Sequence, residues 1–262
     1  MPDSLFLEER RRLILEQLHL HGRVSVKALS DALDVSAVTI RQDLQALENE
    51  KLLKRTHGGA MLLNRDPASE QSELSFDLRR QKNTAEKDAI GKAAAAFVEN
   101  GFGIAFDAST TVCSVIPHLR HLNALTIVTN NLLITGQVLD LPQFEVLLPS
   151  GQLRRSANSI TGGSDSLPDI NLAVGFFSAW GVTYESGFTE VDREEMEMKK
   201  ALLARCALSI VLVDSTKWGK VAPYTYATSA GISRIITTEL APPSLVQPFR
   251  DAGVTLEIVA QP

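Results

Sequence analysis

The stretch SAVTIRQDLQALENEKLLKRTHGGAM, residues 36–61, decides the fold of the N-terminal part of the chain. Ser36 can accept a hydrogen bond from a free backbone N–H of the turn that follows, so it predicts a helix N-cap. Ile40, Leu44 and Leu47 then recur at helical spacing and predict a single buried stripe. The other side chains of this helix are left free to point away from the core.

A hairpin and two more helices accompany this helix. After it, LLKRTHGGAML predicts two short strands around a Gly-Gly turn. Before it, residues 24–33 predict a second helix with Ser25 as N-cap, and only residues 34–35 separate the two helices. A turn this short makes the helices cross steeply, as in a helix-turn-helix. Residues 8–20 predict a third helix that completes a small core.

These segments resemble the N-terminal winged helix-turn-helix of the DeoR family of bacterial transcription regulators. The resemblance runs from Glu9 to Ala60 through ERRRLILEQL and VSVKALSDALDVSAVTIRQDLQALENEKLLKRTHGGA, with the HGGA wing tip in place. It implies that the chain binds double-stranded operator DNA, with the helix after Ser36 in the major groove. The family often has a second Arg where this chain has Gln42, so we expect a different operator. The alternative is a small helical domain that binds another protein.

Charge limits where DNA can bind. Residues 1–63 hold nine Lys or Arg and nine Asp or Glu, so the basic footprint must be local. Arg41 suits guanine and Gln42 suits adenine, whereas cations on the hairpin suit phosphates, with Lys51 among them. The residues expected to contact DNA are Ser36, Ala37, Thr39, Arg41, Gln42, Lys54, Arg55, His57 and Gly58.

Composition predicts a cytoplasmic protein of two domains. The 262 residues carry a net charge of −5, which belongs wholly to residues 64–262. Two cysteines are too few for a disulfide framework, and their surroundings predict buried, reduced thiols. The first residues are acidic and then basic, unlike a signal peptide, and no apolar run is long enough to span a membrane. We expect no metal, because the five His residues lack ligand spacing, and no cofactor.

The sequence divides into three parts. Residues 1–63 form the winged helix-turn-helix, residues 64–84 a polar linker, and residues 85–262 an effector-sensing and oligomerisation domain. In the last part, short apolar strands alternate with helices, which predicts an α/β fold with a mainly parallel sheet. Within it we expect a helix over 111–122 and one strand over 172–182.

Polar residues follow several of these strands, where ligands of parallel sheets bind. DASTT follows one strand and offers hydroxyls at a helix start, which favours an anion. TNN, SGQ and DSTKWG follow other strands in the same way. Together they predict a pocket for a phosphorylated sugar or polyol. Each Ser or Thr, taken alone, is more often a helix cap.

The order of these patches, over roughly 86–238, also resembles the C-terminal domain of the DeoR family. That domain is related in fold to ribose-5-phosphate isomerases, and the resemblance implies phosphate contacts from residues 109–111 and pocket roles for residues in TNN, TGG, GVT, EMEMKK and DSTKWG. The family usually has Gly where Ser109 stands, and a Gly pair at Gly151-Gln152. The candidate effector-binding residues are Asp107, Ser109, Thr110, Thr111, Asn130, Asn131, Gly151, Arg154, Gly163, Gly181, Thr183, Glu195, Lys199, Asp214 and Lys217.

Two alternatives stay open. Glu195 and Lys199 are four residues apart on a helix, so they could form an ordinary surface ion pair. The whole protein could be an isomerase-type enzyme fused to a DNA-binding domain. An enediol mechanism needs a carboxylate base, and no acid stands in WGVT, where the isomerases place theirs. We therefore favour a repressor of a carbohydrate-utilisation operon over an enzyme. Half-site spacing requires a symmetric homodimer or homotetramer.

Overall fold

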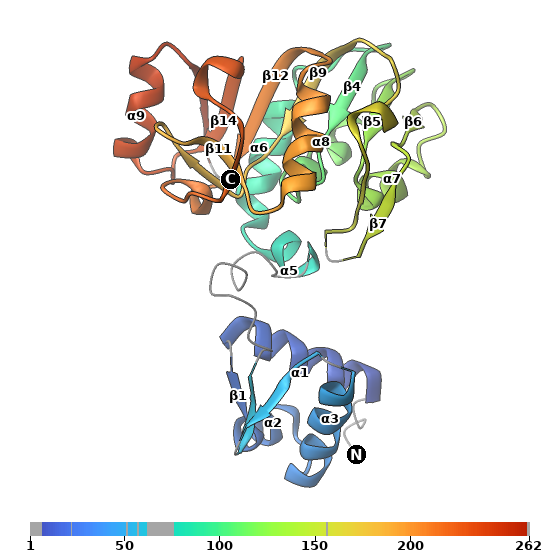
Figure 1. The fold of residues 1–262 in the computed structure, drawn as a ribbon, viewed down its shortest axis with the longest axis vertical. Helices are drawn as coiled ribbons and strands as arrows, with labels where there is room; N and C mark the ends of the chain where they lie inside the picture. Colours follow the sequence, from blue (N-terminus) through green and yellow to red (C-terminus); the bar gives the residue numbers. More distant parts are fainter. Residues whose placement is uncertain are drawn as a thin grey trace. The chain divides into compact units, whose positions relative to one another are not determined.

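The computed structural model describes residues 7–21, 23–50, 52–56, 58–61, 76–155 and 157–260. The chain divides into two compact units, Met1–Leu74 and Ser75–Pro262, which we describe separately (Figure 1). Each unit has its own hydrophobic core, with one buried cluster in the first and two in the second.

The first unit is a winged helix-turn-helix, as the sequence predicts. Its elements are α1 (Leu7–His21), β1 (Arg23–Ser25), α2 (Val26–Leu33), α3 (Ala37–Asn49), β2 (Lys54–Thr56) and β3 (Gly59–Met61). Strand β3 pairs antiparallel with both β1 and β2, so the wing has three strands rather than the two that the sequence indicates.

Local chemistry explains these elements. The Ser36 side chain accepts a hydrogen bond from the Thr39 N–H at 3.1 Å and starts α3, as expected of an N-cap. In the wing, Gly58 has φ of 86°, a backbone conformation that favours glycine. A Cβ on Gly59 would lie 1.9 Å from the Val24 carbonyl oxygen. The Gly-Gly pair therefore allows both the turn and the close approach of β3 to β1.

A buried carboxylate fixes α3 against α1. Asp43 is only 2% exposed and pairs with Arg10 at 2.6 Å and Arg11 at 3.4 Å. It lies on the same helix face as the apolar stripe of Ile40 and Leu44, which is fully buried. The orientation of α3 thus depends on this charge pairing as well as on apolar packing.

The second unit is a three-layer α/β structure. Its strands and main helices are α5 (Phe76–Gln81), α6 (Thr84–Ala95), β4 (Gly103–Phe106), β5 (Thr126–Thr129), α7 (Leu132–Val138), β6 (Glu145–Leu147), β7 (Gln152–Arg154), β8 (Ser159–Thr161), β9 (Leu172–Phe177), β10 (Gly181–Thr183), β11 (Gly187–Glu190), α8 (Arg193–Leu203), β12 (Cys206–Val213), β13 (Tyr224–Ala227), β14 (Arg234–Thr238), α9 (Pro243–Asp251) and β15 (Thr255–Val259). Short 3-10 turns are η1 (Val112–Ser114), η2 (Ile116–Leu119), η3 (Ser164–Ser166), η4 (Ser215–Lys217) and η5 (Ser229–Gly231).

Seven strands form one sheet in the order β15-β14-β12-β9-β4-β5-β6, and each neighbouring pair is parallel. Alternate β12 residues supply two cores: Ile210 and Leu212 belong to the cluster containing α6 and α7, and Val211 and Val213 to the cluster containing α8 and α9. The order of strands along the chain reverses between β4 and β9. In open α/β sheets such a switch point is where ligands bind.

Two small antiparallel sheets lie outside this seven-stranded sheet. One joins β10, β11 and β13, and the other is the β7–β8 hairpin. The sequence predicts neither arrangement. The hairpin is attached to the end of β5, where the Ile160 N–H donates to the Asn130 carbonyl at 2.9 Å.

Two predicted elements are wrong in detail. Residues 111–122 form the 3-10 turns η1 and η2 rather than one helix, since Pro117 lacks a backbone N–H. The predicted strand over 172–182 ends at Phe177 and resumes as β10, because Ser178 turns away to bond other groups. Its N–H donates to Asp107 and its carbonyl accepts from Lys199.

In the predicted linker, residues 64–75 lie outside the described residues, and α5 occupies part of the remainder. The domain boundaries themselves stay a prediction. None of the described helices has the length and apolar character needed to cross a membrane.

We predict that Asp43→Asn destabilises the winged-helix unit by about 2 kcal/mol, because the partly buried guanidinium groups of Arg10 and Arg11 lose the carboxylate that balances their charge. Amide hydrogen exchange of α1 and α3, measured in the full-length protein, reports this loss. The matched control is Glu50→Gln, which removes the exposed partner of Arg11 at 3.5 Å and should cost less than about 0.5 kcal/mol. Similar costs for the two variants would contradict this view of Asp43.

Candidate functional sites

The exposed face of α3 is the candidate DNA-reading surface. Arg41 and Gln42 are exposed, as the sequence predicts, and Ala37 and Thr39 are half-buried beside them. Val38, which the sequence analysis overlooked, is 61% exposed on the same helix. A guanidinium, an amide and an apolar side chain are the groups that read guanine, adenine and the thymine methyl in the major groove.

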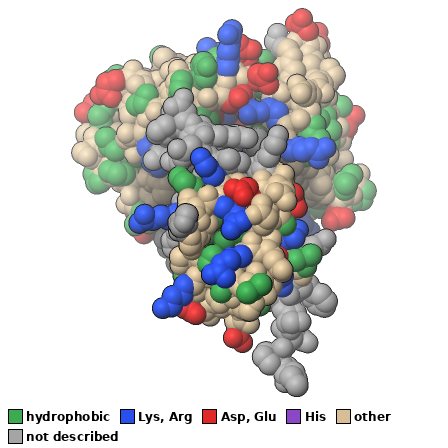
Figure 2. All heavy atoms as spheres, turned by 60° about the horizontal axis from the view of Figure 1, so that its bottom comes forward, with side chains coloured by type: hydrophobic (Ala, Val, Ile, Leu, Met, Phe, Trp, Pro, Cys, Tyr) green, Lys and Arg blue, Asp and Glu red, His purple; other side chains and the backbone are tan. Residues whose placement is uncertain are grey.

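The wing supplies further cations. Lys54 and Gly58 are exposed. Arg55 is half-buried, and its guanidinium donates to the side chain of Gln45, so it ties the wing to α3 as well as carrying charge. Figure 2 shows several Lys and Arg side chains on the forward face of this unit, among uncharged and acidic ones. Lys51 and His57 lie outside the described residues.

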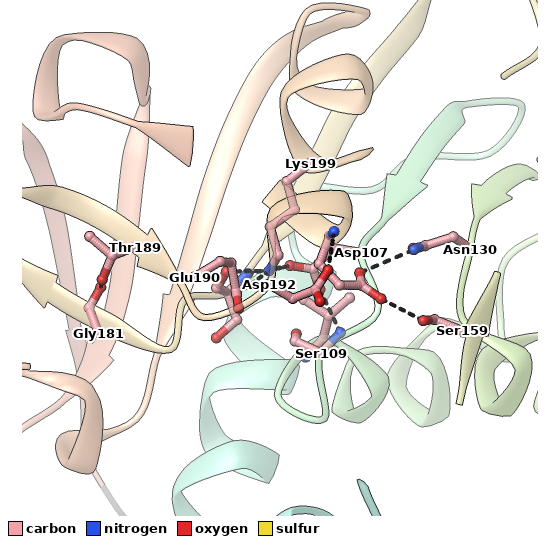
Figure 3. A network of polar contacts seen from close by, with 12 residues as sticks. Asp107, Ser109, Asn130, Ser159, Gly181, Thr189, Glu190, Asp192 and Lys199 are labelled. Carbon is pink, nitrogen blue, oxygen red and sulfur yellow. Dashed lines mark hydrogen bonds and ion pairs between the residues drawn. The ribbon is translucent and has the colours of Figure 1, made fainter. Parts of the chain in front are cut away.

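In the second unit, a buried ion-pair network occupies the carboxyl edge of the sheet at its switch point (Figure 3). Lys199 of α8 lies 2.5 Å from Asp107, which follows β4, and 3.0 Å from Glu190 at the end of β11. Asp107 also accepts the backbone N–H groups of Ser109 and Ser178, at 2.8 and 2.7 Å. The network thus links the chain after β4 and after β9 to the end of β11 and to α8.

Lys199 remains charged in this site. Burial by itself lowers the pKa of Lys199, but the nearby charges of Asp107 and Glu190 outweigh it and hold that pKa above its ordinary value. Lys199 and Glu195 are only 3% and 7% exposed, so the surface ion pair considered above is wrong.

Glu195 forms a second cluster beside this network. Its carboxylate accepts from Ser159 at 2.5 Å and from Asn130 at 3.3 Å, and lies 3.5 Å from Arg154. Arg154 also pairs with Asp192 at 2.8 Å. Burial raises the pKa of the Glu195 carboxyl above its ordinary value, although the Ser159 hydrogen bond and the charges of Lys199 and Arg154 oppose the change.

Three buried polar atoms at this edge have no hydrogen-bond partner among the described residues: Asn130 Oδ1, the Tyr226 hydroxyl and Arg79 Nε. The Tyr226 ring lies beside Lys199, with the ammonium 5.2 Å from its centre. The charges of Glu190, Glu195 and Asp107 act on Arg79. Buried polar groups are nearly always bonded, so unpartnered ones gathered in one place indicate a site for a polar ligand.

The loop after β4 adjoins a cavity of about 270 Å³. Thr110, Lys87 and Gln137 are among its lining residues, and Gln137 Oε1 is a further buried atom without a partner in the described residues. Thr110 and Thr111 are buried, and their backbone N–H groups have no backbone acceptor among the described residues. Free N–H groups next to a lysine suit an anion.

Other candidate residues have local structural partners. Side chains that accept backbone N–H groups of the turns following them are those of Ser109, Asn131, Thr183 and Asp214. Gly151 and Gly181 lie where a Cβ would fall 2.0 and 2.3 Å from backbone oxygens, whereas Gly163 has open space. Lys217 is half-buried, and burial lowers its pKa in spite of the nearby Asp214 charge.

The structure therefore brings together Asp107, Asn130, Arg154, Glu195 and Lys199, and adds residues that the sequence analysis missed. Glu190, Asp192 and Ser159 are contributed by segments with no motif of their own. A buried lysine needs buried carboxylates, but sequence spacing does not say which ones supply them. His, Cys, Asp and Glu side chains in the described ranges form no group of three that could hold a metal ion.

Comparison with known proteins agrees with these two units. The model of the "DeoR-like helix-turn-helix domain" matches residues 10–66, and that of the "DeoR C terminal sensor domain" matches residues 82–239. The HTH-type transcriptional regulator GolR of Listeria innocua is 34% identical over 97% of this chain and 99% of its own length. The uncharacterized HTH-type transcriptional regulator YulB of Bacillus subtilis is 30% identical, over 97% and 98%.

A further relative is the glycerol-3-phosphate regulon repressor of Escherichia coli, 29% identical over 95% of this chain and 98% of that one. Among solved structures, ribose 5-phosphate isomerase A of Methanocaldococcus jannaschii aligns with a TM-score of 0.40 and 14% identity. It covers 52% of this chain and 55% of that one. This likeness is too weak to add to the fold described above.

We predict that Lys199→Met lowers the free energy of unfolding of the second unit by about 3 kcal/mol at neutral pH, because Asp107 and Glu190 lose their buried cation.

Urea unfolding followed by the fluorescence of Trp180 and Trp218, which both belong to this unit, measures the change. Lys200→Met is the matched control, because Lys200 is the exposed neighbour of Lys199 and should cost less than about 0.5 kcal/mol. A loss of the same size in the control would show that the buried pairing is not the cause.

Proposed function

Because the chain belongs to the DeoR family of transcription regulators, we propose that it is a DNA-binding repressor controlled by a phosphorylated sugar or polyol. The observation that carries the ligand half of this proposal is the carboxyl edge of the seven-stranded sheet. There, unpartnered polar atoms and incompletely balanced cations surround the Lys199 network. The name of one relative, a glycerol-3-phosphate regulon repressor, supports the same ligand class.

The site offers distinct groups to the two ends of such a ligand. The cations Lys217 and Arg79 and the free N–H groups after β4 suit a phosphate. The carboxylates and Asn130 suit sugar hydroxyls, because an ionised carboxylate only accepts hydrogen bonds and a hydroxyl can donate one. We therefore infer that specificity among sugars resides in the Glu195 cluster.

Regulation requires coupling between this site and the DNA-reading helix. Two winged-helix units must be held at half-site spacing by a symmetric assembly, so we propose a homodimer or homotetramer built by the second unit. Ligand and operator must change each other's affinity by the same factor, typically worth 1–3 kcal/mol. A regulator of bacterial operons works in the cytoplasm, where the DNA is.

The isomerase alternative is less favoured. The site does contain acids, since Asp107, Glu190 and Glu195 gather there, although WGVT holds none. Asp107 and Glu190, however, pair with Lys199, and Glu195 accepts from Ser159 and Asn130. A general base must be free to take a proton from the substrate. The relatives described above are also named as regulators.

We predict that one phosphorylated sugar or polyol raises the melting temperature of the protein while its unphosphorylated parent does not. Saturating ligand stabilises the folded state by RT ln(1 + [L]/Kd), about 2.7 kcal/mol at a hundredfold excess over Kd. Thermal unfolding against a panel of phosphate esters and their parents tests this. A panel without any shift would refute the sugar-phosphate sensor and leave DNA binding untouched.

We also predict different effects of Arg41→Ala and Lys54→Ala on DNA binding. Arg41→Ala should cost about 1–3 kcal/mol and relax the preference at one base pair, because a base contact is lost. Lys54→Ala should weaken binding to all sequences and lower the salt slope by about 1, because a phosphate contact is lost. Sites selected from random duplex DNA with the unaltered protein provide the test sequences. Identical specificity profiles for the unaltered protein and Arg41→Ala would contradict a base-reading role.

A further inference from the structure

Helix α5 is the first described element of the second unit, and the chain before it leads to the wing. It is anchored by Phe76, which is 3% exposed and belongs to the core cluster that contains α6. The Arg79 guanidinium lies 5.7 Å from the centre of the Phe76 ring. The buried Phe76 side chain therefore fixes the start of α5, and Arg79 packs against its ring.

Lys87 of α6 holds the other end of α5. It is 5% exposed, and its ammonium donates to the backbone carbonyls of Arg79 and, at 2.6 Å, of Lys82. A cation at a helix C-terminus meets the carbonyls that have no partner within the helix. The neighbouring Glu86 accepts from Ser215 at 2.8 Å and from Thr238 at 2.6 Å, so the start of α6 is fixed to the sheet edge.

Arg79 lies near the carboxylates at the carboxyl edge of the sheet but forms no ion pair with them in the described residues. Its Nε is buried without a hydrogen-bond partner in the described residues, and no ion pair joins its guanidinium to a carboxylate there. Burial lowers the pKa of Arg79, and the more distant charges of Glu190, Glu195 and Asp107 only oppose this change. The contrast with Lys199, which is buried in direct contact with two carboxylates, is clear.

Lys217 and Lys87 are two further cations whose burial is not fully compensated by nearby negative charge. Burial lowers the pKa of Lys217, and it lowers that of Lys87 to about 8, while each cation also feels the positive charge of Arg79. Asp214, the carboxylate that acts most strongly on both lysines, is itself engaged by Thr216 and Asn83. A group with two negative charges placed among these cations would correct the imbalance.

We propose that Arg79 binds the phosphate group of the effector, so that the ligand is held in part by α5, the first described helix of the second unit. This inference rests on the proposed function, because it assigns one residue to the phosphate end of that ligand. A guanidinium can give a phosphate two parallel hydrogen bonds, which a lysine cannot reproduce. In the sequence, Arg79 falls within the predicted linker of residues 64–84.

The position of Arg79 makes α5 a regulatory element. A ligand bound by Arg79 would stabilise α5, and α5 directly follows the segment that leads to the winged-helix unit. A ligand held only by the strand-end loops would have no contact with that helix. Binding through Arg79 therefore offers a route for the coupling that the proposed function requires.

The test uses the full-length protein and inorganic phosphate, titrated at constant ionic strength against chloride. Thermal unfolding is followed by the intrinsic fluorescence of the two tryptophans of the second unit. The variants are Arg79→Gln, Arg79→Lys and, as matched control, Arg80→Gln, which removes the same charge from the exposed neighbouring residue of the same helix. We expect phosphate to bind at least about tenfold more weakly to Arg79→Gln, and Arg80→Gln to bind it as the unaltered protein does. Arg79→Lys, which keeps the charge, should fall between them.

Amide hydrogen exchange over residues 76–81 provides the second measurement. Phosphate should slow exchange of α5 in the unaltered protein and in Arg80→Gln, but not in Arg79→Gln. If Arg79→Gln melts early without phosphate, Arg79→Lys decides the same question in a less perturbed protein.

Three outcomes would overturn the inference. Unchanged phosphate binding by Arg79→Gln would show that this residue is not a ligand contact. A loss confined to Arg80→Gln would place the anion in the cavity that Arg80 helps to line. Equal losses in Arg79→Gln and Arg80→Gln would indicate a general charge effect. If neither phosphate nor any ester of the panel stabilises the unaltered protein, the proposed function itself fails, which is a different result.

Discussion

The ammonium of Lys199, buried against Asp107 and Glu190, is the constraint on which the second unit depends. A buried charge is tolerated only when opposite charges and hydrogen bonds surround it closely. Meeting that demand brings together the end of β4, the end of β11 and the middle of α8, and it draws the chain after β9 out of the sheet through Ser178. The shape of the sheet's carboxyl edge follows from this pairing.

The winged-helix unit solves a similar problem in a simpler way. Asp43 is buried on α3 and is neutralised by two consecutive arginines of α1. Apolar stripes alone would leave the helices free to slide or rotate slightly, because dispersion contacts have little directionality. A charge-assisted hydrogen bond is directional and sets one orientation. In both units, a buried ion pair fixes the geometry of the functional surface that it supports.

Buried charges with an ion-pair partner and buried charges without one have different roles in this protein. Lys199 and Asp43 have their partners within the chain, and we interpret them as structural. Arg79 and Lys217 are desolvated without an adequate carboxylate partner, and Asn130 and Tyr226 hold buried atoms with no bond in the described residues. Such groups lower the stability of the fold, and perturbed groups of this kind cluster at binding sites. This contrast is our physical basis for locating the ligand.

Sequence by itself determined the elements whose signals are local. The N-cap at Ser36, the apolar stripe of α3, the Gly-Gly wing tip and the alternation of apolar strands with helices all depend on residues a few positions apart, and they predicted both fold classes correctly. The family resemblance extended these patterns to function. Strand ends likewise gave the general position of a polar edge, because parallel strands place their carboxyl ends together.

Only the tertiary structure decided which polar residues face one another there. Asn131 and Asp214 look like pocket residues in sequence, yet their side chains cap turns. Glu190 and Arg79 belong to no sequence motif, yet Glu190 pairs with Lys199 and Arg79 is one of the buried cations without a carboxylate partner in the described residues. Partner choice between buried charges depends on distances across elements up to 92 positions apart in the chain. Spacing along the sequence carries no record of such distances, because they are set by how the sheet and helices pack.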